Sequence, residues 1–384
     1  MALYSRKNGM EQPYWKIGIF KIRLPFIHHQ LELPEFLQGL VLFAMGLSVI
    51  PIMEGSLGFS YEAALASVII FQFLMMIPSM MGVPFVAGQL TPMIPIVVVY
   101  LSNFEPGAEA IQAMVALQVL IAVIFLVMGI TGWGEKLTNI LPRAIRGGII
   151  LGAGVAAILG QIQEGGNLVS TPISLIIGFL LCLFIMYSVL FKKLTKIKFF
   201  SLIANGGILT PILIAIFIGI IVQEYPTPTI EWGLVIPAFG ELWQHTPFVV
   251  GFPSLDLLLY ALPTAIVAYI IGYGDIVVGD ELINVSQARR KDEKIVTNIG
   301  LLHHTVFIRN FVSGLLAPHP GMAGPIFTAG MATVTARYSE GKKAMESIYS
   351  GANSFVIGVF LPLFILPLVT FFQPYLPVVS VKLK

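Results

Sequence analysis

Two short stretches far apart in this chain share the pattern Pro-x-(Val/Met)-Ala-Gly-x-(Leu/Ile), namely Pro84-Phe-Val-Ala-Gly-Gln-Leu90 and Pro320-Gly-Met-Ala-Gly-Pro-Ile326. Each leads into an apolar segment that is too short or too interrupted for an ordinary membrane helix. Lipid cannot satisfy free N–H and C=O groups, so unwound backbone at membrane depth persists only where it is buried in protein or lines a cavity. Paired interruptions in two halves of a chain therefore indicate the binding site of a membrane transporter.

The composition predicts an all-α polytopic membrane protein. Of the 384 residues, 57% are hydrophobic and 11% are charged, and the mean hydropathy is +0.88, whereas soluble domains carry about 25% charged residues. The sequence contains no basic run with interleaved aromatic residues, so we do not expect nucleic acid as a partner. The single cysteine, Cys182, gives neither an intrachain disulfide nor a metal cluster. No catalytic or nucleotide-binding fingerprint occurs, so we expect no enzyme, no cofactor and no metal.

Eleven segments are long or apolar enough to be candidate membrane spans, given that a spanning helix needs about 20 mostly apolar residues. They are 34–53, 60–82, 91–102, 108–131, 145–162, 172–191, 204–223, 256–275, 298–317, 326–338 and 349–372. The third and the tenth are short, and each follows one of the paired motifs. Residues 224–255 are rich in Pro, Trp and Phe, which is typical of a segment at the membrane interface.

Lysine and arginine are placed as a chain with a cytoplasmic N-terminus requires, because cytoplasmic loops carry the positive excess. The outer loops 54–59, 103–107, 163–171 and 224–255 contain neither residue. The inner loops contain Lys136, Arg143, Arg146, Lys192, Lys193, Lys196, Lys198, Arg289, Arg290, Lys291, Lys294, Arg337, Lys342 and Lys343. We expect an integral protein of the plasma (inner) membrane with its N-terminus inside.

Several motifs, taken in order and spacing, resemble the nucleobase–cation symporter-2 family of uracil, xanthine and related permeases. They are the run 36–51 with Gln38 and a following Ala-Met before Pro51, the broken segment 84–95, Pro142 with the glycine-rich run after it, Ala268–Tyr273 and Asn310–Gly321. The resemblance covers about residues 34–372. Sulfate permeases and bicarbonate transporters share the architecture of this family.

The resemblance implies seven-span inverted repeats divided into a core and a gate, with two half-helices that follow short extended segments. The implied division is 1–33, a cytoplasmic N-terminal segment; 34–134, core repeat 1; 135–255, gate repeat 1; 256–372, core repeat 2; and 373–384, a tail. Spans 12–14, the second half of the gate, have no counterpart in this sequence. A protein of this type is expected to need both gate halves or a partner chain.

The two interruptions have the chemistry of a site for an anion or an electron-rich carbonyl. Half-helices that point their N-termini at the membrane midplane present free N–H groups and the positive ends of their dipoles. Gly88, Gly321 and Gly324 allow close backbone approach, and Pro92 and Pro325 fit the first turn of a helix. A single such motif is more simply explained as a kink between packed helices, but the pairing favours a binding site.

Four side chains beside the interruptions are candidates to contact a solute. Gln89 and Thr91 on the first, and Thr328 on the second, can donate hydrogen bonds to a planar base, and Phe327 can stack on it. For Phe327 alone, ordinary packing is the simpler explanation.

The resemblance places the first of the two glutamates of the uracil permease branch at Tyr269 and the second at Ile326 or a neighbour, and neither position is acidic here. This disfavours nucleobase–proton symport and favours a small anion or an organic acid. Tyr269 and Tyr273 lie four residues apart, hence on one helix face, where they can line the site or pack at an interface. The predicted substrate-binding set is Gly88, Gln89, Thr91, Tyr269, Tyr273, Gly324, Ile326, Phe327 and Thr328.

Three ionisable residues fall near the proposed site. Asp275 is a candidate for ion coupling, because intramembrane acids are commonly functional, although its position at the end of the eighth span favours solvation. His319 is a candidate proton-sensitive group, with a satisfied hydrogen-bonding role as the alternative. Arg309 needs a carboxylate, a carbonyl or room to reach water, and a structural role is favoured for it.

The sequence predicts a secondary transporter for a small planar or anionic solute, such as a nucleobase or a related organic anion, driven by an ion gradient through alternating access. One alternative is an uncoupled anion channel or facilitator of the sulfate-permease type. Another is a partner-dependent or inactive, shortened permease. The expected partners are the solute, a proton or sodium ion, the lipid bilayer and, as an option, a second copy of the chain.

Overall fold

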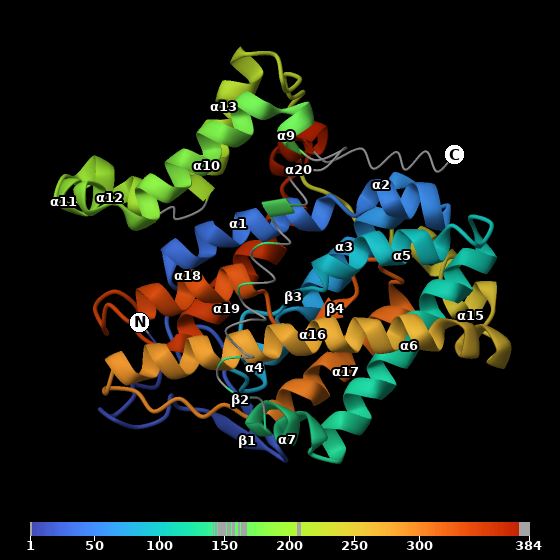
Figure 1. Cartoon of the computed structure of the whole chain (residues 1–384), viewed down its shortest axis with the longest axis horizontal. Helices are drawn as coiled ribbons and strands as arrows, with labels where there is room; N and C mark the ends of the chain where they lie inside the picture. Colours follow the sequence, from blue (N-terminus) through green and yellow to red (C-terminus); the bar gives the residue numbers. More distant parts are fainter. Residues whose placement is uncertain are drawn as a thin grey trace.

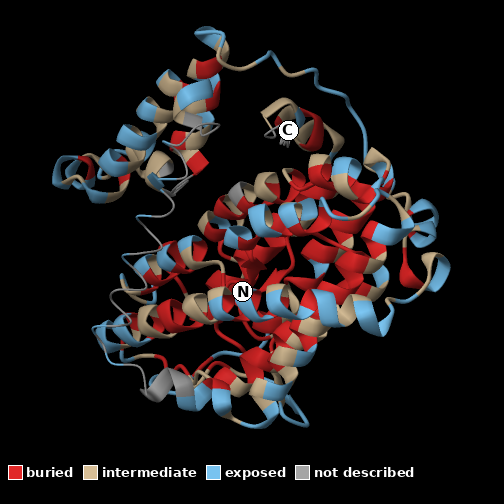
Figure 2. Ribbon diagram, turned by 45° about the vertical axis from the view of Figure 1, so that its right-hand side comes forward, coloured by how far each residue is buried: buried red, intermediate tan, exposed pale blue. Residues whose placement is uncertain are grey.

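The computed structural model describes residues 2–140 and 167–375 apart from 206–208, with scattered positions between 141 and 166. Its main body is a bundle of helices, and a helical arm stands beside it (Figure 1). The bundle is built on α1 (Leu33–Leu47), α3 (Tyr61–Leu74), α6 (Ala108–Ile130), α16 (Leu255–Arg289), α17 (Ile299–Leu316) and α19 (Ile348–Phe360). In the described part α17 packs along α6, α6 contacts α16, and α1 packs along α19. Buried residues concentrate between these helices (Figure 2).

Four stretches are long and apolar enough to cross a membrane: Leu33–Leu57, Tyr61–Met80, Ala108–Ile130 and Leu255–Arg289. Shorter apolar helical stretches are Thr91–Leu101, Pro172–Tyr187, Leu209–Ile221 and Ile348–Phe364. The chain is thus an integral membrane protein of mostly helical structure, as the sequence predicted. The predicted fifth span, 145–162, lies almost wholly outside the described residues. The inverted repeat, the domain boundaries and the missing gate half stay predictions.

Several long helices begin at a side-chain cap, which satisfies one of the free N–H groups at a helix start. Ser60 accepts from Ala63 N at 3.1 Å, Ser254 from Leu257 N at 3.2 Å and Asn298 from Leu301 N at 2.8 Å. Ser347 forms a capping box at the start of α19. These caps mark starts that hydropathy alone places only within a few residues.

Four predicted spans differ from the observed helices in their ends or by a break. The eighth continues past residue 275 to Arg289 without a break, so Asp275 lies inside α16, not at its end. The first is interrupted between α1 and α2 (Ile50–Ile52), which leads into η1 (Met53–Leu57). The eleventh is divided into α19, η3 (Leu361–Phe364) and α20 (Leu366–Phe372). Prolines stand at these breaks, where a ring without an N–H interrupts helical bonding. The second span likewise contains α3 and a short α4 (Ile77–Met80).

The arm consists of α9 (Asn167–Ser170), α10 (Pro172–Tyr187), α11 (Val189–Leu194), α12 (Lys198–Asn205) and α13 (Leu209–Ile221). Its α10 and α13 pack against each other, and much of its apolar surface is exposed (Figure 2), which suits contact with lipid. Glu224 closes the start of α10 by accepting from Ile173 N and Ser174 N, both at 2.7 Å. A carboxylate at this end also complements the helix dipole.

Two short helices follow the arm, α14 (Phe239–Gln244) and α15 (Pro247–Val250). The first packs on α3 and the second on α6. Their half-exposed Trp243 and Phe248 stack with ring centroids 5.4 Å apart. Exposed aromatic rings suit the membrane interface. The interfacial role of this segment stays a prediction.

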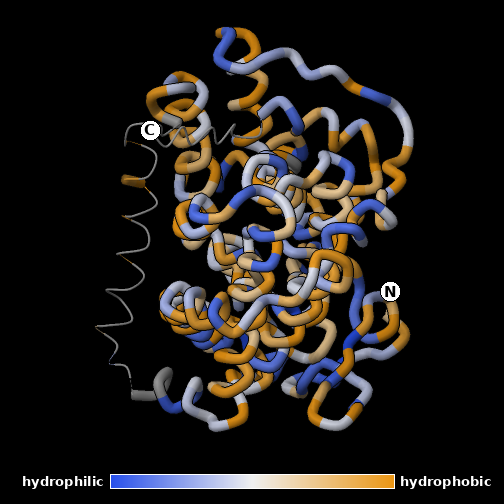
Figure 3. Tube along the Cα trace, turned by 90° about the vertical axis from the view of Figure 1, so that its right-hand side faces the viewer, coloured by the Kyte–Doolittle hydropathy of each residue, from blue (hydrophilic) through white to orange (hydrophobic). Residues whose placement is uncertain are grey.

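Residues 2–30 fold back over one end of the bundle, and we call them the N-terminal strap. They contain a hairpin of β1 (Trp15–Ile17) and β2 (Phe20–Ile22), and the N-terminus lies beside this end (Figures 1 and 3). Arg23 N donates to Met80 O at 2.8 Å. Arg6 donates to Asp292 Oδ2 at 2.9 Å and to Glu346 O at 2.8 Å. The strap therefore joins segments that the charge pattern predicts on the inner side of the membrane.

Candidate functional site

The two interrupted motifs lie side by side as a pair of short antiparallel strands, β3 (Gly88–Gln89) and β4 (Ala323–Gly324). Gly88 pairs with Gly324, and Gln89 pairs with Ala323. The pairing continues on both sides, because Leu90 N donates to Gly321 O at 2.9 Å and Phe327 N to Val86 O at 2.8 Å. Backbone groups left without helical partners thus satisfy each other across the two motifs.

A short helix leaves each strand. After β3 come η2 (Thr91–Met93) and α5 (Ile94–Leu101), and after β4 comes α18 (Thr328–Tyr338). Figure 1 shows α5 and α18 leaving the strand pair in opposite directions. Unlike α3, α16 and α17, neither η2 nor α18 has a side-chain cap at its start. At the start of η2 only the N–H of Thr91 remains for a bound group, because Pro92 has none and Met93 N bonds to Leu90 O at 2.9 Å. At the start of α18 the N–H groups of residues 328–330 remain.

Two glycines allow the strands to approach this closely. A Cβ on Gly88 would lie 2.7 Å from the Cβ of Phe327, and one on Gly324 would lie 3.0 Å from the backbone oxygen of Gln89. The obstacle at Gly324 is backbone, which cannot rotate away. This close approach is the reason for the Ala-Gly pattern common to the two motifs.

Two adjacent residues of α17 brace the strand pair from behind. Arg309 donates from Nη1 to Gly324 O at 2.8 Å and from Nη2 to Gly88 O at 3.0 Å. Asn310 donates to Ala323 O at 2.8 Å and accepts from Ala323 N at 2.9 Å. All these groups are buried. For Arg309 the sequence predicted a carboxylate, a carbonyl or water as partner, and the structure shows carbonyls. The sequence did not predict that Asn310 holds the strand pair.

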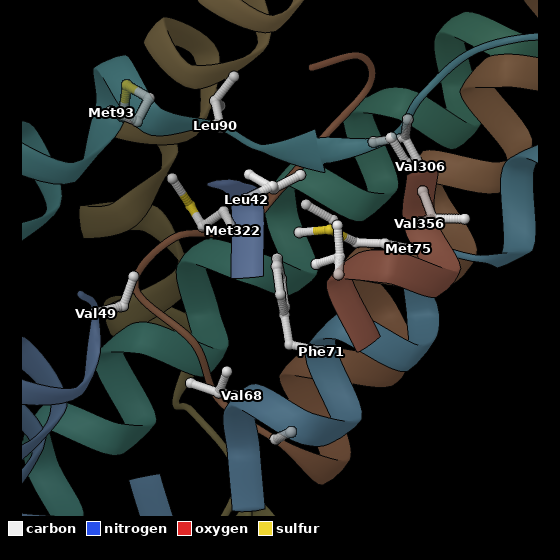
Figure 4. Packing of buried hydrophobic residues seen from close by; sticks show 14 of the residues in the cluster. Leu42, Val49, Val68, Phe71, Met75, Leu90, Met93, Val306, Met322 and Val356 are labelled. Atoms are coloured by element: carbon white, nitrogen blue, oxygen red, sulfur yellow. The ribbon is translucent and has the colours of Figure 1, made fainter. Parts of the chain in front are cut away.

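Apolar side chains pack around the strand pair. Figure 4 shows residues of α1, α3 and the two motifs, among them Leu42, Phe71, Leu90 and Met322, meeting in one cluster. These side chains are almost fully buried. The pair therefore sits in an apolar, closely packed environment, where an unsatisfied polar group is costly.

Two polar groups beside β3 and β4 have no protein partner among the described residues. Gln89 is 4% exposed, and its Nε2 makes no hydrogen bond. His319 is fully buried, stacks on Phe71 with centroids 3.9 Å apart, and accepts from Gly321 N at its Nδ1. That bond leaves the proton on Nε2, which is also without a partner. A Cβ on Gly321 would meet both side chains, so they lie close together.

On the side of α16, Asp275 reaches the start of α18. Its Oδ1 accepts from Thr328 Oγ1 at 2.8 Å, so two residues predicted for different roles are in contact. Ile326 lies against Gly279 of the same helix and is buried. Phe327 is partly buried at the edge of the pair, with its ring 6.0 Å from that of Phe355.

The two predicted tyrosines are directed mainly toward other helices. Tyr269 shares a hydrogen bond of 3.2 Å with His303 Nε2, and its ring lies 5.0 Å from that of Phe125. Tyr273 is half-buried, 6.1 Å from Tyr269 by ring centroid. The hydroxyl of Tyr269 is therefore engaged with α17 and not with the strand pair. Thr91 is exposed at the start of η2.

A cavity of about 300 Å³ lies elsewhere, between α10 and α13 of the arm. Its walls are mostly apolar and include Gly178, Cys182 and Tyr225. None of the predicted site residues lines it. We favour the strand pair as the site, because free donors and uncapped helix starts converge there.

Comparison with known proteins finds a curated relative and, among the similar solved structures, the domain of a bicarbonate transporter. No family model matches the chain. The guanine/hypoxanthine permease PbuG of Bacillus subtilis is 24% identical over 261 residues, which cover 67% of this chain and 53% of the permease. The chain thus spans about half the length of this relative. The transmembrane domain of the cyanobacterial bicarbonate transporter BicA is 15% identical, with a TM-score of 0.48 over 89% of this chain and 86% of that one.

The apolar helices define the class of this chain as an integral membrane protein, and the curated relative that it resembles is a permease. Within that class, its resemblance to the nucleobase permeases, predicted from the order of the sequence motifs, is confirmed by this relative.

Proposed function

We propose that the chain is a secondary transporter that binds a small planar or anionic solute, such as a nucleobase or a related organic anion, at the β3–β4 pair. The observation that carries this proposal is the pairing of Gly88 with Gly324, followed on each side by an uncapped half-helix. Free N–H groups at two helix starts favour an anionic or carbonyl oxygen. The partnerless Gln89 Nε2 adds a further donor.

The proposed transport couples the solute to a proton or a sodium ion at Asp275. Its carboxylate touches Thr328 at the start of α18, so a cation that binds there alters the charge beside the solute. His319 is kept as a second candidate for proton coupling. Transport by alternating access requires the bundle to move against the arm, and the sparse contact between α1 and α13 is compatible with such movement.

Alanine at the paired glycines tests the site. We expect Gly88→Ala and Gly324→Ala to separate the strands, because the new Cβ atoms meet Phe327 and the backbone of Gln89. A distortion of about 1–3 kcal/mol lowers solute binding by roughly 5- to 150-fold. The measurement is uptake of radiolabelled hypoxanthine, xanthine and uracil into proteoliposomes under an imposed proton or sodium gradient.

The matched control is Gly240→Ala, because a Cβ at Gly240 meets no atom within 4 Å. It should keep the uptake of the wild type, and all variants should elute as monodisperse protein. Wild-type uptake in both Gly88→Ala and Gly324→Ala would show that the strand pair is not the binding site. Currents without accumulation against a gradient would assign the chain to the uncoupled channels.

A further inference from the structure

One buried charge at the strand pair has no counter-charge among the residues that the structure describes. Arg309 is fully buried in α17, and both of its hydrogen bonds go to neutral backbone carbonyls, one on each strand. Among the described residues it forms no ion pair, and its Nε has no partner. Carbonyl dipoles orient a guanidinium but do not neutralise it, and a buried unpaired charge is costly.

Other groups at the pair add to this positive charge or partly oppose it. The starts of η2 and α18 contribute the positive ends of their dipoles. Asp275 is the acid that reaches the start of α18, but its carboxylate is bonded to Thr328 and not to Arg309. Once a proton or a cation neutralises Asp275, the guanidinium of Arg309 is the group that carries a whole unit charge beside the strand pair.

We propose that Arg309 makes this a site for solutes that are bound as anions, and that its bound solute compensates the buried guanidinium. This inference rests on the proposed function and narrows its solute class to a planar organic anion. The planar form is favoured because the partnerless amide of Gln89 and the ring of Phe327 lie at the two edges of the pair. Arg309 acts here as a positioning residue through the carbonyls of Gly88 and Gly324.

Equilibrium binding to the purified full chain in detergent at pH 7.5 tests this. The probes are radiolabelled urate, an anion at this pH, and radiolabelled hypoxanthine, a neutral purine of similar shape, with unlabelled nitrate and bicarbonate as competitors. Wild-type protein should bind urate at least about tenfold more tightly than hypoxanthine, since a hydrogen bond or attraction to a charged group has roughly this effect. Stronger competition by nitrate or bicarbonate than by urate would assign the site to inorganic anions.

Two substitutions separate charge from architecture. Arg309→Lys keeps the charge but can reach the two carbonyls less well, and we expect it to keep the preference for urate. Arg309→Met removes the charge, and we expect urate binding to fall about tenfold or more while hypoxanthine binding changes little. A purely structural role would weaken both solutes equally in both variants. Size-exclusion profiles and melting temperatures identify a variant that does not fold.

The wild-type comparison decides the matter even if Arg309→Met fails to fold. Hypoxanthine binding without binding of any anion would support the proposed transport site and overturn the inference about charge. Binding of none of the probes would overturn the inference and also count against the nucleobase-like solute class. Uptake that depends on Gly88 and Gly324 but shows no preference for anions would likewise support the proposed transport function. It would contradict the role given to Arg309.

Discussion

At the residue scale, the strand pair depends on side chains that bond to backbone from another helix. Asn310 uses its amide N–H and its carbonyl oxygen on the two backbone groups of one residue, Ala323. Arg309 spans both strands with one planar fork. Backbone held in this way loses its shape when a partner is removed, because a buried N–H or C=O without a partner costs about 1–3 kcal/mol.

Asn310→Leu is therefore expected to destabilise the protein by roughly 2–4 kcal/mol, since it leaves two buried backbone groups of Ala323 without partners. The measurement is the free energy of unfolding in detergent and denaturant, supported by the melting temperature. Asn284→Leu is the matched control, because Asn284 is exposed and bonds to Asp280 on its own helix. Equal losses in the two variants would contradict the bracing role.

The sequence predicts the interrupted backbone but not its braces. Gly88, Gly324 and the prolines around them are recognisable, because only a few residue types suit extended backbone and helix starts at membrane depth. The sequence around Arg309 does not indicate that one of its partners is the carbonyl of Gly88, which is 221 residues away in sequence. A carbonyl acceptor exists at every residue, so the chemistry of a donor does not identify its partner.

At the element scale, close helix packing depends on glycines that face another backbone. A Cβ added to Gly358 of α19 would overlap the backbone oxygen of Phe36, and one added to Gly39 of α1 would overlap that of Phe355. Small residues are commonly found where membrane helices touch. The backbones of α1 and α19 are therefore in direct contact, which fixes the position of one helix along the other.

Gly358→Ala should cost about 1–3 kcal/mol of stability, because the helices must separate to admit one methyl group against backbone. Gly55→Ala is the control, since a Cβ there meets no atom within 4 Å. Thermal unfolding of both variants in the same detergent gives the comparison. A melting temperature for Gly358→Ala equal to that of Gly55→Ala would refute this close contact.

Element boundaries show where hydropathy is a poor guide. The predicted eighth span ends at 275 because Asp275, Asp280 and Glu281 lower the hydropathy there, yet α16 continues to Arg289. The hydrogen-bonding potential of the backbone does not depend on side-chain polarity, so a helix can carry acids that face protein. This extension moves Asp275 from a solvated end to the start of α18, which the sequence did not predict.

At the scale of the whole molecule, the N-terminal strap ties one end of the bundle together. Its buried His29 lies beside Asn353 of α19, whose Nδ2 is 2.8 Å from His29 Nε2. Burial lowers the pKa of His29 from 6.5 to about 4, and the nearby charges of His28 and Arg23 lower it further against the opposing bond to Gln30. The folded protein therefore holds this ring neutral at a pH where the unfolded chain would protonate it.

Acidification is expected to weaken the strap in a defined window. Below pH 6.5 the unfolded chain binds a proton at His29 that the folded chain does not bind, so stability falls from about pH 6.5 until the folded ring titrates near pH 4. The full effect is about 3 kcal/mol. Melting temperatures between pH 7.5 and pH 4 should decline less steeply in His29→Gln than in wild-type protein.

The wild-type protein, measured beside His29→Gln in the same buffers, is the reference for this pH dependence. If His29→Gln and wild-type protein lose the same number of degrees over this range, another group is responsible for any acid sensitivity.

The strap also fixes an order of events during biosynthesis. Arg6 bonds to a residue 286 positions later and to another 340 positions later. At about 5–20 residues per second, the ribosome needs roughly 20–70 s to supply these partners after Arg6 has been made. The segment that is translated first is therefore the last to dock, and its buried arginines must stay hydrated outside the bilayer until the final helices have been inserted.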